Sequence, residues 1–192
     1  MRAIVSMLMV FILCFCSSKT ELNDEEKLIF DAMKDYQLIG EDGKVASLID
    51  LTSEFEEILI EKKFLDSVSK ESYTEFYLKY VVGDYYIDMK EIYKKNNIFI
   101  SMTYPSNLSR GWYIFDEVLR LQNGDELEHF TISKLHPVLE RMLLSSVIEP
   151  DLFKEYLEAV NDSDFEKKNI YRVPLLVLIY DSLEWKEDDS PS

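Results

Sequence analysis

The side chains in this sequence that could bind a metal are two histidines set among glutamates. His129 and His136 are the only histidines of the chain. A histidine and a carboxylate four residues apart share one face of a helix, so His136 and Glu140 could contact the same Zn²⁺ ion. However, the paired-histidine spacing of familiar zinc-binding helices is missing, and Pro137 lies between the two residues. We therefore predict surface residues without a metal or cofactor here, and keep His136 and Glu140 as the candidates for a metal site.

Covalent and phosphate chemistry have little support in the sequence. There is no Gly-x-Ser-x-Gly elbow and no glycine-rich nucleotide-binding loop, and the only cysteines are Cys14 and Cys16. Acidic residues number 37, so no single pair of carboxylates is informative about general acid–base catalysis. The sequence favours a protein that does no chemistry, and a hydrolase that uses carboxylates is the alternative.

Tyrosine is concentrated between residues 73 and 93, where the chain contains Tyr73, Tyr77, Tyr80 and Tyr85. A tyrosine has a large apolar body and a polar hydroxyl, which suits both a buried helix face and an interface with a partner protein. An aromatic stripe at helical spacing favours the buried face. The alternative is a partner-binding surface that contains these four tyrosines and the acidic residues around them.

The chain is strongly acidic, with 21 basic and 37 acidic side chains and a formal net charge of −16. Nucleic acids and anionic membrane surfaces are bound through lysine and arginine, so the charge argues against both as direct partners. A basic protein is compatible with the charge, and solubility is its simpler explanation.

The first eighteen residues have the layout of an export signal. Arg2 precedes an apolar run over residues 3–16, and two serines follow. The run is short for a membrane span. It also resembles a bacterial lipoprotein signal, because Leu13 lies three residues before Cys16, but Phe15 stands where a small residue is usual. Simple cleavage and lipidation of Cys16 are both open, and we expect membrane contact only through this signal or lipid.

The rest of the chain predicts one mainly α-helical domain. We expect an export signal over 1–18, a tether over 19–23, the domain over 24–185 and an acidic disordered tail over 186–192. Apolar residues recur at helical spacing in seven or eight segments, which would suit stacked helix pairs.

The expected helices differ in how clearly the sequence marks them. Glycine ends the first and third helices, and Pro150 suits the first position of another. A strand is predicted over 98–104 from its alternating pattern, and 173–180 fits either a helix or a buried strand. The expected helices cover 24–39, 45–63, 73–82, 85–95 and 112–121, and two more begin near 133 and at 150.

These observations predict an exported, acidic, helical protein of the bacterial envelope, in the periplasm, at the outer membrane or surface, or secreted. We expect it to act by binding another protein, as an inhibitor or an immunity-type partner of a basic enzyme does. The alternatives are the extracytoplasmic hydrolase and a helical scaffold within an envelope assembly.

Overall fold

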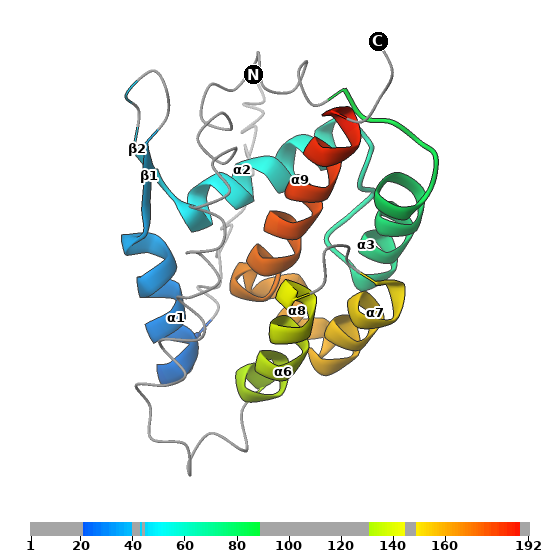
Figure 1. The fold of residues 1–192 in the computed structure, drawn as a ribbon. Coiled ribbons are helices and arrows are strands. Elements are labelled where there is room, and N and C mark those ends of the chain that lie inside the picture. Colours follow the sequence, from blue (N-terminus) through cyan, green and yellow to red (C-terminus); the bar gives the residue numbers. More distant parts are fainter. Residues whose placement is uncertain (1–20, 40–42, 44, 89–130, 145–148, 189–192) are drawn as a thin grey trace, which may run out of the picture.

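The computed structural model describes residues 21–39, 43, 45–88, 131–144 and 149–188, which are mainly helical, as predicted (Figure 1). The predicted strand over 98–104, the helix over 112–121, His129 and the export signal with Cys16 lie outside these residues. The elements are α1 (Asp24–Asp35), β1 (Gln37–Ile39), β2 (Val45–Ser47), α2 (Leu48–Glu61), α3 (Lys70–Phe76), the π-helix η1 (Tyr77–Val82), α6 (Thr131–Leu144), α7 (Pro150–Ala159), α8 (Asp162–Lys167), the 3₁₀-helix η4 (Asn169–Tyr171) and α9 (Val173–Asp188).

Polar side chains begin four of these helices, α1, α2, α3 and α8, by accepting backbone N–H groups that would otherwise lack a partner. Asn23 forms a capping box with Glu26 at the start of α1, where the Asn23 side chain accepts the Glu26 N–H at 2.8 Å. Ser47, Ser69 and Asn161 cap α2, α3 and α8 in the same way. Pro150 begins α7, as the sequence predicted.

A β-hairpin separates α1 from α2, where the sequence predicted that two helices would almost meet. Ile39 pairs with Val45 in antiparallel β1 and β2, so the expected helices over 24–39 and 45–63 were too long at this junction. Gly43 lies in the connection with a φ of 79°, a left-handed conformation that glycine adopts without strain. The apolar residues on both sides of the turn belong to β1 and β2, although their spacing in the sequence also fits the neighbouring helices.

The ambiguous segment 173–180 is a helix, the first half of α9. Pro174 lies in the first turn, where a missing N–H removes no helical hydrogen bond. The Leu176 N–H donates to the Arg172 carbonyl at 2.9 Å, so the helical ladder begins at Arg172. At the other end α9 runs to Asp188, past the predicted domain boundary at residue 185.

The core of the described residues forms around α9, which runs through the middle of the ribbon (Figure 1). α9 packs against α2 and η1, while α6 packs against α7 and α1 against α2. α2 and α9 come from distant parts of the sequence, and their packing joins the described helices into one compact domain. Helices that pack against each other are therefore not always neighbours along the chain. Pro137 lies inside α6, which begins at Thr131.

The π-helix η1 continues α3, and Gly83 ends it, as expected from the sequence. The predicted helix over 85–95 does not begin within residues 85–88, which have no helical structure. A β-carbon added at Gly83 would lie 2.6 Å from the carbonyl oxygens of Leu78 and Lys79. The end of η1 therefore depends on the absence of a side chain at this position.

We expect Gly83→Ala to lower the free energy of unfolding by about 1–3 kcal/mol, as overpacking against fixed groups does. Urea unfolding followed by circular dichroism measures the change. Val82→Ala is the matched control, because Val82 is half exposed and its truncation should change stability by only about 0.5 kcal/mol. Equal effects of the two substitutions would contradict the close approach at Gly83.

Candidate functional site

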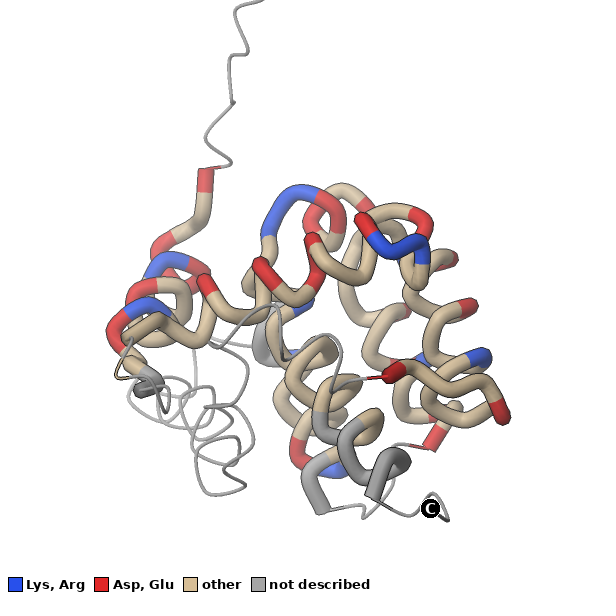
Figure 2. Tube along the Cα trace, turned by 90° about the horizontal axis from the view of Figure 1, so that it is seen from above, with Lys and Arg blue, Asp and Glu red and all other residues tan. Residues whose placement is uncertain are grey.

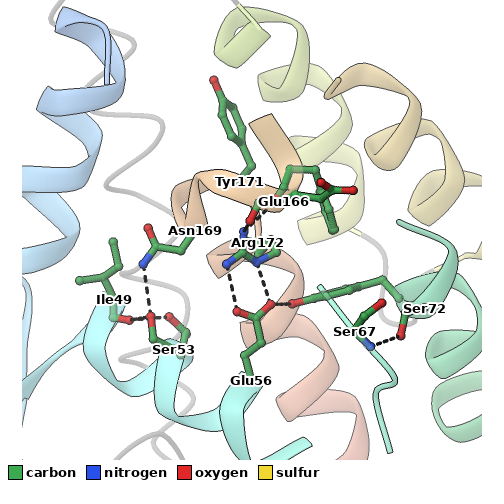
Figure 3. A network of polar contacts seen from close by, with 12 residues as sticks. Ile49, Ser53, Glu56, Ser67, Ser72, Glu166, Asn169, Tyr171 and Arg172 are labelled. Carbon is green, nitrogen blue, oxygen red and sulfur yellow. Dashed lines mark hydrogen bonds and ion pairs between the residues drawn. The ribbon is translucent and has the colours of Figure 1, made fainter. Parts of the chain in front are cut away.

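Among the described residues, a group of buried ionisable side chains connects α1, α2 and α3 with residues 168–172, just before α9. At its centre Arg172 binds Glu56 of α2, with its Nε 2.7 Å from Oε1 and its Nη2 3.0 Å from Oε2. Both side chains are less than a tenth exposed. The hydroxyl of Tyr73, in α3, donates to the same carboxylate. Figure 3 shows the guanidinium and the carboxylate facing each other between α9 and α2.

The third nitrogen of the Arg172 guanidinium is also used. Its Nη1 donates to the backbone carbonyls of Phe165 and Glu166, which lie in α8. The planar guanidinium is suited to this arrangement, because it offers donors in fixed directions to a carboxylate and to carbonyl oxygens together. One arginine thus connects α2, α8 and the start of α9.

A second buried carboxylate, Glu26, ties α1 to the same region. The Lys168 ammonium lies 2.8 and 2.9 Å from its two oxygens, and the Tyr171 hydroxyl donates to it as well. Lys168 also contacts Asp164 at 2.8 Å. Burial alone would lower the pKa of Lys168, but hydrogen bonds to Asp164 and Glu26 outweigh burial, and its pKa rises. We call Glu26, Glu56, Tyr73, Lys168, Tyr171 and Arg172 the charged network.

The chemistry available to the charged network is structural. Glu26 and Glu56 each accept hydrogen bonds from several protein donors, and each is nine-tenths or more buried. A general acid or base must contact the proton that it exchanges with the substrate. In every contact described above, both carboxylates instead accept hydrogen bonds from protein groups.

The described residues also form an open hollow of about 410 Å³ between α3 and α7. None of the network residues lines that hollow, whose lining is Lys70, Glu71, Thr74, Glu75, Lys154, Leu157 and Glu158.

The candidate metal ligands His136 and Glu140 both lie on α6, four residues apart. His136 is partly buried, whereas Glu140 is exposed. Within the ranges that the structure describes, no group of three or more histidine, cysteine, aspartate or glutamate side chains is placed to hold a metal ion. The two residues remain a pair without a third ligand in the described part of the chain.

Three of the four tyrosines lie in the core, on the buried helix face that the sequence favoured, and this contradicts the alternative, a partner-binding surface, for Tyr73, Tyr77 and Tyr80. The exposed fraction is 0% for Tyr73, 1% for Tyr77 and 7% for Tyr80. Tyr77 stacks on Phe153 of α7 at 4.1 Å between ring centroids. Their spacing places them on the inner face of α3 and η1, so they hold helices together. Tyr85 is 62% exposed and remains available for a partner.

Exposed apolar side chains gather in the segment that follows these buried tyrosines. Leu78, Val82, Tyr85 and Tyr86 are each at least half exposed, within nine residues of chain. Lys79 lies over the Tyr85 ring, 5.0 Å from its centroid, and so covers one aromatic face with a cation. We call these four residues the exposed apolar segment. Contiguous exposed apolar side chains are a mark of interaction surfaces.

Sequence reasoning missed the charged network. The signal for Glu26 was present, because Asn23 and Glu26 have the spacing of a capping box. Glu56 lies among Thr52, Phe55 and Leu59 on the apolar side of α2, a position where a charge needs a partner. The residues near Glu26 and Glu56 in the sequence did not indicate which cations would pair with them.

Burial of tyrosine hydroxyls makes the fold sensitive to high pH. Burial raises the pKa of Tyr77 to about 12, with a contribution from the negative charge of Glu149. Burial also raises the pKa values of Tyr73, Tyr156 and Tyr171. The unfolded chain releases these protons near pH 10, before the folded protein does. Stability is therefore complete below pH 10, and we expect it to fall above that pH by about 1.4 kcal/mol per pH unit for each such phenol.

Absorbance of tyrosinate at 295 nm, measured together with circular dichroism from pH 9 to 13, tests this expectation. Tyr73, Tyr77, Tyr156 and Tyr171 should ionise only as helical signal is lost. Ionisation of all 12 tyrosines near pH 10 in a protein that keeps its helices would contradict it.

Over the described residues, no helix is both long enough and apolar enough to cross a membrane. No protein-family model, curated protein or solved structure matches the chain.

Proposed function

We propose that this chain is an exported protein of the bacterial envelope that acts by binding another protein, in the manner of an inhibitor or an immunity-type partner. The observation that carries the proposal is the exposed apolar segment. Four of the six large apolar residues that are exposed in the described part of the chain belong to it. Their concentration in nine residues favours a binding surface, because exposed apolar residues are usually scattered singly.

The charge of the chain supports a basic partner. Acidic positions are spread over the described elements, with fewer lysines and arginines among them (Figure 2), and the formal net charge is −16. Around the exposed apolar segment, Glu75, Asp84 and Asp88 are exposed as well. Exposed apolar and acidic side chains in one segment are complementary to a surface that presents apolar side chains together with lysine and arginine.

Site-specific photo-crosslinking in the native cells tests the surface. A photoreactive phenylalanine analogue in place of Tyr85 should give a discrete adduct with one basic protein. The same analogue in place of Leu28, a half-exposed apolar residue of α1, is the matched control and should not give that adduct. Formation of the adduct should decrease when Leu78 and Val82 are both changed to Ser, and it should decrease with added salt.

Two results would contradict the proposed binding surface. One is the absence of any discrete adduct at Tyr85. The other is the same set of adducts at Leu28, which would indicate general stickiness of exposed apolar residues rather than a specific contact.

The proposed address has its own test, which does not depend on the binding surface. Labelled palmitate should enter the wild-type chain and be lost in Cys16→Ala if Cys16 carries the lipid. Label that persists in Cys16→Ala would exclude Cys16 as the sole anchor. Recovery of the wild-type protein only from the cytoplasmic fraction would contradict export.

A further inference from the structure

The helix at the centre of the domain, α9, is apolar around most of its circumference. From Val173 to Tyr180 every residue is buried except Leu178, which is partly buried. These side chains point in all directions from the helix axis, because eight residues cover more than two turns. A helix that is apolar on all sides is suited to a buried position, but its pattern does not define a face.

Such a helix buries a similar apolar area in several rotations and axial positions, so the free energy of its burial is similar in each of them. Most surface helices have one apolar stripe, and a rotation would expose part of that stripe to water. For residues 175–179 of α9, a rotation exchanges one aliphatic side chain for another. Apolar burial therefore stabilises α9 in the core without selecting one register.

The pair of Arg172 and Glu56 supplies a contact that depends on register. Arg172 stands immediately before α9, and its carbonyl oxygen accepts the first helical hydrogen bond. Its two bonds to Glu56, at 2.7 and 3.0 Å, need the guanidinium and the carboxylate to be coplanar and aligned. A rotation by one residue about the helix axis, or a shift along it, would leave both charges buried and unpaired.

We infer that the Arg172–Glu56 ion pair fixes the rotation and axial position of α9 against α2, and that this specificity is its main contribution to the fold. A buried polar residue at one position of a coiled coil sets register in the same way, at some cost in stability. The proposal does not depend on the proposed function.

The test replaces the pair and its third member by apolar side chains of similar length. In the full-length chain, the triple variant Tyr73→Phe, Glu56→Met and Arg172→Met should keep its helical circular dichroism and be more stable than Arg172→Met alone. A 3-fluorotyrosine at position 180 reports on register, because the Tyr180 ring lies edge-on against Phe55 of α2, 5.4 Å between centroids.

In the wild type we expect one sharp ¹⁹F resonance from residue 180. The triple variant should show several resonances or one broad resonance, and amides over 175–180 should exchange with solvent at least about tenfold faster. Thr52→Val is the matched control. Thr52 is buried on α2, as Glu56 is, but the Thr52 hydroxyl donates only to carbonyl oxygens of α2 itself. Replacing this hydroxyl should therefore leave one sharp resonance from residue 180.

Two outcomes overturn the inference. A triple variant with one sharp resonance and wild-type exchange rates would show that apolar packing fixes the register of α9 without the ion pair. A triple variant that has lost its helical circular dichroism would show that the pair is needed for stability rather than for register.

Discussion

Arg172→Met lowers the free energy of unfolding by about 3–5 kcal/mol, because the substitution leaves the Glu56 carboxylate buried without its cation. Glu56 would keep only the hydrogen bond from the Tyr73 hydroxyl. The carbonyls of Phe165 and Glu166 would also lose the donor that they now share. Since domains are stable by only about 5–15 kcal/mol, this loss is a large fraction of the total stability. Urea unfolding monitored by circular dichroism measures the loss.

The chain offers a matched control for this prediction. Arg141 forms an ion pair with Glu155, between α6 and α7, and both side chains are about half exposed. Exposed pairs of this kind contribute about 0–1 kcal/mol, so Arg141→Met should have little effect on stability. If Arg172→Met were as mild as Arg141→Met, the substitution could not have left the Glu56 carboxylate buried without a cation.

Phe55→Ala should destabilise the protein by a similar amount, about 3–5 kcal/mol, through a different mechanism. Phe55 is fully buried on α2 and contacts the Tyr180 ring of α9. Truncation to alanine removes apolar surface from the core and leaves a cavity that the surrounding helices fill only in part. The expected measurements are a lower urea midpoint and a lower melting temperature.

Leu28→Ala is the control for Phe55→Ala, because Leu28 is a large apolar residue that is 47% exposed on α1. We expect a change of only about 0.5 kcal/mol there. A Phe55→Ala variant that is as stable as Leu28→Ala would mean that α2 and α9 do not pack closely at this point.

Local patterns predicted the parts of this fold that local chemistry determines. Pro150 marked the start of α7 because a proline at the first helical position loses no hydrogen bond. The mainly helical class followed from apolar spacing at 3.6 residues. The same spacing failed at Ile39 and Val45, where a short hairpin takes residues that also fit a helix. It could not decide between helix and strand for 173–180, because a segment that is buried on every side has no period.

The charged network could not be predicted from the sequence for a different reason. Glu56 finds Arg172 at a separation of 116 residues, and Glu26 finds Lys168 at a separation of 142. In a chain with 37 acidic and 21 basic residues, composition permits many such pairings. Only the packing of α2 against α9 selects one of them. For Tyr73, Tyr77 and Tyr80 the sequence favoured the core but left an interface open, because one helical stripe is compatible with both.

The sequence separation of the two ion pairs also has a consequence for the time at which the protein can fold. The cations that neutralise the buried carboxylates of α1 and α2 lie in residues 168–172, near the end of the chain. Contacts between such distant residues slow folding, because a large loop must close before they form. While the ribosome is still making residues 168–172, Glu26 and Glu56 keep their water, and the first helices cannot bury them. A growing chain therefore cannot bury Glu26 and Glu56 together with their cations before residues 168–172 have been made.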